Sequence, residues 1–293
     1  MSEYNKTYRL EDEHVYKGAH MPGFSPASLL AEVEQYEFDD EDLLVATYSK
    51  CGTSLMQAIA YLVATEDFDH EKSLQQLVPF LEMYVDGMGS GLDIVRTRKD
   101  PGVIKTHLTP ESFEKTLKKK KTKFIVGIRN IKDVLVSYYH MYRLCQPGFL
   151  NYKGTWDDFF EMFKEDRLAY GNYFILNKLW WEWRNDPRVL FIRYEDILKN
   201  KAAMIRKVAA FLGKNLREES VEKIVQQTSF ESMKKDPRYN RLDETFLDQS
   251  ISPFLRKGKV GDWRNYFTKE QNEYCEKLVE EHFKPMGLDI EFD

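Results

Sequence analysis

Short apolar runs rich in β-branched residues recur along the chain, and longer stretches with helical spacing of apolar positions separate them. The clearest runs are LLVAT at 43–47, KFIVGI at 123–128 and VLFIR at 189–193. Their length and their helical neighbours are typical of strands buried on both faces of a parallel sheet. A shorter run, Val103-Ile104-Lys105, predicts a further strand.

Six stretches have the spacing expected of helices. They are Thr53–Thr65, Ile131–Arg143, Trp156–Lys164, Asn172–Arg184, Lys201–Leu212 and Lys269–Phe283. Thr109, Thr155 and Thr268 precede a proline or acidic and amide side chains, as helix N-caps do. No repeat and no Gly/Ser/Pro linker divides the sequence. We therefore expect an α/β fold: a single domain over residues 1–293, with a central parallel sheet flanked by helices and ligands bound beyond the carboxyl ends of its strands.

Charge and composition narrow the function classes. The 293 residues include 43 Lys+Arg and 48 Asp+Glu, for a formal net charge of −5, which argues against general affinity for nucleic acid or for an anionic membrane. Three cysteines at unrelated spacings form neither a disulfide framework nor a zinc motif, which fits a reducing compartment. The first residues lack the apolar core of a signal peptide, and no apolar stretch could span a bilayer, so a cytoplasmic location is expected.

The segment after the first predicted strand has the features of a phosphate-binding loop. In Tyr48-Ser49-Lys50-Cys51-Gly52-Thr53-Ser54, glycine allows the backbone to approach a ligand, and the following helix start favours negative charge. The alternative is an ordinary strand-to-helix turn. The segment at 48–54 resembles a P-loop but is not a Walker A loop, because no G-x-x-x-x-G-K-[ST] occurs in the sequence. An ordinary ATP or GTP enzyme is therefore disfavoured.

Two further segments suit an anion. Arg129 ends the second predicted strand, and Ser137 lies two turns into the helix that follows; the alternative for this pair is an Arg129–Asp133 ion pair with Ser137 as a packing residue. Near the C-terminus, FLRKGKVGDW at 254–263 places three cations among two glycines, with a solvated basic loop as the alternative.

Together these segments resemble the cytosolic sulfotransferases, whose pattern reads roughly YPKSGTTW, RNxKDVxVSYYHF and RKGxxGDW. This chain has YSKCGTSL, RNIKDVLVSYYHM and RKGKVGDW in the same order. Further matches are KTHL at 105–108, YED at 194–196, TSF at 228–230 and SISPF at 250–254. The resemblance runs from about Phe24 to the last predicted helix.

The resemblance implies transfer of a sulfuryl group from 3′-phosphoadenosine 5′-phosphosulfate to a hydroxyl or amine, without a metal. By the same resemblance the donor contacts Lys50, Cys51, Gly52, Thr53, Ser54, Leu55, Arg129, Ser137, Tyr194, Thr228, Phe230, Leu255, Arg256, Lys257 and Gly258. Within that set, Lys50 to Ser54 hold the 5′ side, the 3′-phosphate lies on Arg129, Ser137 and residues 256–258, and Tyr194 and Thr228 contact the adenine.

The expected chemistry needs a base that is neutral near pH 7, and imidazole is the natural choice. His107 follows the strand at 103–105, which would end beside the phosphate-binding loop. His140 is the only other candidate for the base. For either histidine, the alternative is a surface or core imidazole without a catalytic role. Lys50 would stabilise the bridging oxygen of the departing phosphate, and Lys105 the sulfuryl oxygens.

The acceptor is expected to be a small apolar alcohol such as a phenol or sterol, with an amine left open. The predicted acceptor pocket is aromatic and contains Phe24, Phe80, Tyr84, His107, Tyr139, Tyr142, Phe149, Tyr170 and Phe246. For each single aromatic residue, core packing is the alternative.

Three of the departures from the family pattern bear on function. Cys51 replaces a serine, and its place at a helix start beside Lys50 would lower the thiol pKa, unless it is a buried, inert thiol. Leu55 replaces a tryptophan that stacks on adenine. Lys269 replaces an apolar residue of a small dimer contact, so we expect a monomer or at most a weak homodimer.

Two other functions compete with a sulfotransferase. A nucleotide-dependent small-molecule kinase should carry a Walker A loop, which is missing. A catalytically silent nucleotide-binding module should have lost Lys50 or His107, and both are present. We therefore expect an enzyme.

Overall fold

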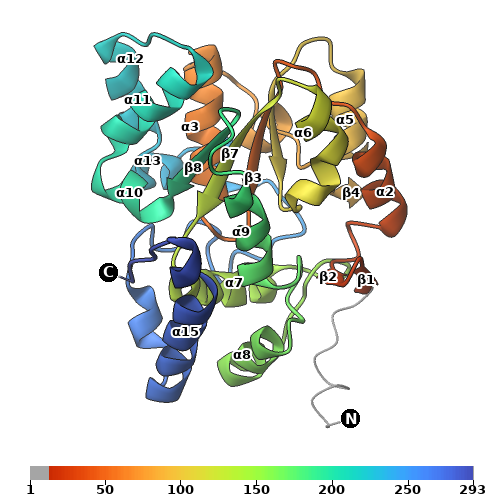
Figure 1. Ribbon diagram of the computed structural model, residues 1–293, viewed down its shortest axis with the longest axis vertical. Helices are drawn as coiled ribbons and strands as arrows, with labels where there is room; N and C mark the ends of the chain where they lie inside the picture. Colours follow the sequence, from red (N-terminus) through yellow and green to blue (C-terminus); the bar gives the residue numbers. More distant parts are fainter. Residues whose placement is uncertain (1–12, 293) are drawn as a thin grey trace.

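A four-stranded parallel sheet forms the centre of the molecule (Figure 1), in the order β6-β3-β7-β8. The computed structural model describes residues 13–292; residues 1–12, on which the expectation about a signal peptide rests, and residue 293 lie outside the described part. The strands of the sheet are β3 (Leu43–Thr47), β6 (Val103–Thr106), β7 (Lys123–Ile128) and β8 (Val189–Arg193). The predicted parallel sheet is confirmed, and β6 is one residue longer than expected.

Two short antiparallel pairs lie outside this sheet. They join β1 (His14–Tyr16) to β2 (Ala19–Met21), and β4 (Tyr84–Val85) to β5 (Gly89–Ser90). Strands of two or three residues carry no alternation of apolar and polar positions that a sequence pattern could reveal.

Helices fill most of the remaining chain. The α-helices are α2 (Ala27–Gln35), α3 (Thr53–Thr65), α4 (Leu74–Leu77), α5 (Gly91–Thr97), α6 (Glu114–Lys119), α7 (Ile131–Leu144), α8 (Trp156–Lys164), α9 (Tyr173–Glu182), α10 (Tyr194–Lys199), α11 (Lys201–Leu212), α12 (Glu218–Gln227), α13 (Phe230–Lys235), α14 (Pro237–Asn240) and α15 (Lys269–His282). Three 3₁₀ turns are η1 (Pro110–Phe113), η2 (Asp262–Asn265) and η3 (Lys284–Met286). All six predicted helices are present, each within two residues at both ends.

The predicted N-caps are confirmed at two of three positions. Thr155 and Thr268 each accept a hydrogen bond from the backbone three residues on and complete a capping box. Thr109 makes no capping hydrogen bond with its side chain, because the chain enters a 3₁₀ turn there rather than a full α-helix. Asn172, expected inside a helix, is instead the N-cap of α9.

The sheet separates two apolar cores. Leu44 and Ala46 point into a core shared with α2, α7 and α9, whereas Leu43 and Val45 point into a core shared with α3 and α11. Figure 1 shows α3 and α11 on one side of the sheet and α2 and α6 on the other. At Gly127 a Cβ atom would lie 2.3 Å from Met56 Sδ, so glycine lets α3 pack closely on the sheet.

Candidate active site

The loop between β3 and α3 bends sharply at the carboxyl end of the sheet. Lys50 and Gly52 both have left-handed backbone conformations, with φ of 69° and 86°. A Cβ at Gly52 would lie 2.3 Å from the ring of Tyr194, so only glycine permits this approach. Thr53 begins α3 and its Oγ1 lies 2.7 Å from Thr47 Oγ1. The loop therefore places the first amides of α3 at the carboxyl end of the sheet, where the sequence predicts that an anion binds.

Arg129 follows β7 and faces this loop from the neighbouring strand. Its guanidinium lies 4.4 Å from the centre of the Tyr194 ring, and it donates hydrogen bonds to the carbonyls of Lys50 (3.3 Å) and Lys259 (3.4 Å). Its Nη2 lies 3.8 Å from Asp133 Oδ2, so the alternative ion pair is present too. Its Nε is buried without a hydrogen-bond partner among residues 13–292. An unpaired buried donor is costly, so this position suits an anionic ligand.

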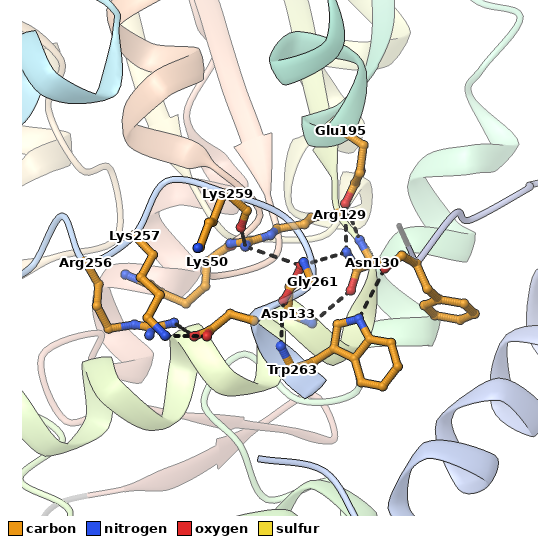
Figure 2. Close-up of polar contacts among 12 residues, drawn as sticks. Lys50, Arg129, Asn130, Asp133, Glu195, Arg256, Lys257, Lys259, Gly261 and Trp263 are labelled. Carbon is orange, nitrogen blue, oxygen red and sulfur yellow. Dashed lines mark hydrogen bonds and ion pairs between the residues drawn. The ribbon is translucent and has the colours of Figure 1, made fainter. Parts of the chain in front are cut away.

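A third segment, residues 256–263, packs against the start of α7 (Figure 2). The carboxylate of Asp133 accepts hydrogen bonds from the backbone amides of Gly261 (2.8 Å) and Trp263 (3.1 Å), and from Asn130 Nδ2 (3.1 Å). At Gly258 a Cβ would lie 2.1 Å from the Phe230 ring. Asp133 thus fixes the backbone of this segment relative to Arg129.

Asp262 holds the two cations of the same segment. Its carboxylate forms ion pairs with Arg256 (2.5 Å) and with Lys257. Burial raises the pKa of Asp262, but hydrogen bonds from Lys257, Asn265 and Arg256 outweigh burial and lower the pKa to about 2. Arg256 and Lys257 are therefore oriented by a carboxylate that a bound phosphate would have to compete with.

The cations of the site lie close enough together that, in addition to burial, electrostatic repulsion lowers the pKa of Lys50. Burial lowers the pKa of Lys50 to about 7, and the charges of Arg241, Arg129 and Arg256 add to the effect. An anion placed among these side chains would reverse the shift, because it favours the protonated ammonium.

His107 follows β6 and is buried at the edge of the site. Its Nδ1 lies 2.8 Å from the carbonyl oxygen of Thr47, and its backbone amide donates to Glu82 Oε1 at 2.6 Å. A carbonyl only accepts, so Nδ1 carries the proton and Nε2 keeps a free lone pair. Burial lowers the pKa of His107, and the neighbouring charges of Lys105 and Lys50 lower it further. The imidazole is therefore neutral at neutral pH and able to accept a proton.

Lys105 and Glu82 lie on either side of this histidine. Lys105 Nζ lies 3.4 Å from the centre of the Phe80 ring. Burial lowers the pKa of Lys105 and raises that of Glu82, which is fully buried. The rings of Phe80 and Tyr170 lie 5.1 and 5.0 Å from the His107 ring.

One cavity of about 580 Å³ connects these groups. The predicted site residues that line it are Lys50, Gly52, Thr53, Ser54, Leu55, Lys105, His107, Arg129, Ser137, Tyr194, Thr228, Phe230, Leu255, Arg256, Lys257, Gly258, Phe24, Phe80, Phe149, Tyr170 and Phe246. Segments more than 200 residues apart in sequence therefore share one space, which is lined by several cations and several phenylalanine rings.

Four predicted site residues do not line the cavity. Cys51 is fully buried behind the loop, and burial raises its thiol pKa, so the expected lowering does not occur. Tyr142 is fully buried and its hydroxyl accepts from the amide of Ala169 at 2.6 Å. Tyr139 packs in the core against Trp156 and Phe159, 5.6 Å from each ring. Tyr84 is 42% exposed on β4.

His140, the competing histidine, does not line the cavity either. Its Nε2 lies 2.7 Å from Tyr266 Oη, on the side of α7 that faces the C-terminal segment. Burial lowers its pKa to about 4. Among residues 13–292 no three His, Cys, Asp or Glu side chains form a cluster that could hold a metal ion.

Sequence reasoning did not find four charged residues of this site: Glu82, Asp133 as an acceptor for the segment at 256–263, Asp262 and Arg241. No motif marks Glu82 or Arg241: Glu82 binds the amide of a residue 25 positions away, and the Arg241–Glu244 pair lies between the matched motifs at 228–230 and 250–254. The GDW triplet contains Asp262, so its charge opposite two cations was the one available signal.

Comparisons with known proteins agree with this geometry. A family model described as "Sulfotransferase domain" matches residues 40–287. Sulfotransferase 1C2 of Oryctolagus cuniculus is 38% identical over 265 residues, covering 88% of each chain, and sulfotransferase 1A1 of Bos taurus is 39% identical, covering 91% of this chain and 90% of that one.

Solved structures show the same fold. Mouse sulfotransferase SULT7A1 complexed with PAP has a TM-score of 0.77 and 30% identity, covering 93% of this chain and 95% of that one. Retinol dehydratase in complex with androsterone and inactive cofactor PAP has a TM-score of 0.84 and 25% identity, covering 99% and 96%. No helix of residues 13–292 has the length and apolar character to cross a membrane. The chain belongs to the sulfotransferase family and is a sulfotransferase enzyme.

Proposed function

We propose that this enzyme moves the sulfuryl group of 3′-phosphoadenosine 5′-phosphosulfate to the hydroxyl of a small apolar acceptor, with His107 as the base. In the transfer a bond forms between the acceptor oxygen and sulfur while the bond between sulfur and the 5′-phosphate oxygen breaks. The hydroxyl proton passes to His107 Nε2, and 3′-phosphoadenosine 5′-phosphate leaves. An amine acceptor would lose its proton in the same way.

The observation that carries this proposal is the tautomer of His107. The Nδ1–H donates to the Thr47 carbonyl, and Nε2 belongs to the ring edge that is free to meet a ligand in the cavity. A depressed pKa keeps the imidazole unprotonated, which is the state that a general base requires.

The residues present also fit the donor. The buried, unpartnered Nε of Arg129 and the low pKa of Lys50 are the features expected where an anion binds. Lys50 would stabilise the bridging oxygen, Lys105 the sulfuryl oxygens, and Arg129, Ser137, Arg256 and Lys257 the 3′-phosphate. Tyr194, Thr228 and Phe230 would contact the adenine, with Leu55 beside them as a smaller apolar surface.

The acceptor side is apolar. Phe24, Phe80, Phe149 and Phe246 form a connected series of rings beside His107. A planar phenol or a sterol suits such a wall, and the androsterone complex of retinol dehydratase gives a relative with a steroid ligand. We propose further that the chain is a single domain in the cytoplasm, monomeric or weakly dimeric, without a metal, a nucleic-acid partner or a membrane partner.

The test compares two histidine variants. His107→Asn should lower kcat by about 10²–10⁴-fold, the usual effect of removing a general base, with 2-naphthol as acceptor. The affinity for 3′-phosphoadenosine 5′-phosphate should change little, because His107 contacts the acceptor hydroxyl. His140→Asn is the matched control and should retain wild-type turnover, since His140 lies outside the cavity. A His107→Asn enzyme within a few-fold of wild type would refute the assignment.

A further inference from the structure

Arg241 is a buried cation of the cavity that the proposed mechanism does not use. It follows α14 with a left-handed φ of 59°, an unfavourable conformation for a side chain of this size. Its side chain is only 9% exposed, and it lines the cavity. Gln249 Nε2 donates to its carbonyl at 2.9 Å, while Gln249 Oε1 accepts from the amide of Phe254 at 3.0 Å. The position of Arg241 is thus fixed by its neighbours.

Ring contacts place Arg241 between the donor cations and the acceptor wall. Its guanidinium carbon lies 4.7 Å from the centre of the Phe254 ring and 5.7 Å from that of Phe246. Lys50 Nζ also lies 4.7 Å from the Phe254 ring, so the two cations are at most twice that distance apart. Phe246 stacks on Phe149 at 4.4 Å and so begins the wall of rings that ends at His107.

The guanidinium is only partly used by the protein. Glu244 accepts from Nε at 2.7 Å and from Nη2 at 2.5 Å, and Nη1 has no hydrogen-bond partner among residues 13–292. The charge of Arg241 contributes to lowering the pKa of Lys50, Lys105 and His107. Arg241 is therefore close enough to the reacting groups to act on a molecule bound between them.

We propose that Arg241 binds an anionic substituent of the acceptor, so that the preferred substrates are phenols carrying a carboxylate at the end of the molecule opposite the hydroxyl. This inference rests on the proposed function. The hydroxyl would lie at His107, the ring along the phenylalanines, and the carboxylate on Nη1. Guanidinium matches a carboxylate in geometry and charge, and an apolar surrounding strengthens the pair. A neutral acceptor that covers Nη1 would displace its water without offering a charged hydrogen-bond acceptor in return.

The experiment measures kcat/KM for four matched phenols. They are 3-(4-hydroxyphenyl)propanoate, its primary amide, 4-ethylphenol and tyramine. We expect the acid to exceed its amide by about tenfold to a hundredfold, the range for a hydrogen bond to a charged group. Arg241→Gln should remove this preference through KM of the acid, so that the ratio of kcat/KM for the acid to kcat/KM for its amide falls to about one. Arg241→Lys, which keeps the charge, should restore part of the preference.

Two further variants sharpen the result. Glu244→Gln removes the competing carboxylate and should increase the preference for the acid. Arg206→Gln removes an arginine from an exposed pair with Glu218 and is the matched control, which should leave all four rates unchanged.

Three outcomes would overturn the inference. Equal rates for acid and amide in the wild-type enzyme would refute it, and so would a preference for tyramine, which would indicate that Glu244 selects an amine. An equal loss for all four phenols in Arg241→Gln would show that Arg241 serves the sulfuryl donor instead. The comparison of the acid with its amide in the wild-type enzyme tests the inference even if a variant fails to fold. Absence of sulfation with all four phenols and with androsterone would refute the proposed function itself, a different result from loss of selectivity.

Discussion

Replacing Asp133 by alanine should weaken nucleotide binding although Asp133 need not touch the nucleotide. Its carboxylate accepts three hydrogen bonds, from Gly261 N, Trp263 N and Asn130 Nδ2, and it is almost fully buried. Each hydrogen bond to a charged group contributes about 1.5–3 kcal/mol, and such losses are less than additive. We expect Asp133→Ala to lower the free energy of unfolding by about 3–5 kcal/mol, as for other broken buried charge networks.

The nucleotide effect follows from the segment that Asp133 fixes. Residues 256–263 carry Arg256 and Lys257, which lose their position when the two amides are released. We expect the affinity for 3′-phosphoadenosine 5′-phosphate to fall by at least about tenfold, equivalent to about 1.4 kcal/mol. Asp133→Asn keeps one accepting oxygen and should be intermediate.

Isothermal titration calorimetry and urea denaturation measure the two effects separately. Asp186→Ala is the control: Asp186 binds Arg188, whose carbonyl accepts from Phe124 at the start of β7, the end of the strand away from the site. The Asp186→Ala enzyme should bind the nucleotide with an affinity within about twofold of wild type. A folded Asp133→Ala protein that binds the nucleotide as tightly as wild type would show that residues 256–263 are held by other contacts.

Three further outcomes are expected. Burial lowers the pKa of Lys50 to about 7, so its ammonium is lost as pH rises above 7; nucleotide affinity should fall between pH 7 and 9 with proton uptake on binding, and Lys50→Arg should flatten this profile in calorimetry. Burial raises the thiol pKa of Cys51, so iodoacetamide should leave the native enzyme active and Cys51 unmodified by mass spectrometry; rapid inactivation that Cys51→Ser abolishes would contradict this. Lys269 is 82% exposed beside Glu273, and analytical ultracentrifugation should find a monomer that Lys269→Val makes more prone to associate; a tight wild-type dimer unaffected by that change would refute the argument.

Local patterns predicted the sheet and the cationic residues that line the cavity near the carboxyl ends of its strands. Residues 43–47 are all buried, so their apolar character alone identifies a strand between two layers of helices. Arg129 directly follows β7, Lys50 and Gly52 lie in the loop after β3, and parallel strands bring their carboxyl ends to one edge. These residues could therefore be placed without knowing any long-range contact.

The residues of the acceptor side were harder to predict from sequence, because α7 is buried on most of its surface. Leu135, Tyr139 and Tyr142 form the stripe that faces the core, whereas Ser137 and Met141, four residues apart, face the cavity. Both faces carry apolar or small residues, so composition does not distinguish them, and for Tyr139 and Tyr142 the structure shows the alternative of core packing.

Contacts across long sequence separations were not predictable at all. Glu82 meets the amide of His107 from 25 positions away, and Arg241 meets Phe254 through a loop held by one glutamine. Neither contact depends on a local pattern of apolar and polar residues. Only the folded backbone shows that these charges belong to the same site.

Phe254 packs against both Lys50 and Arg241, the cations that we propose for the two substrates. Its ring contacts Lys50 on the proposed donor side and Arg241 on the proposed acceptor side, and Gln249 ties its backbone to that of Arg241. A shift of the ring on binding one substrate would change the free energy of binding the other, and linkage would make the effect equal in both directions. We therefore expect acceptor affinities measured on the free enzyme to differ from those measured on the nucleotide-bound enzyme.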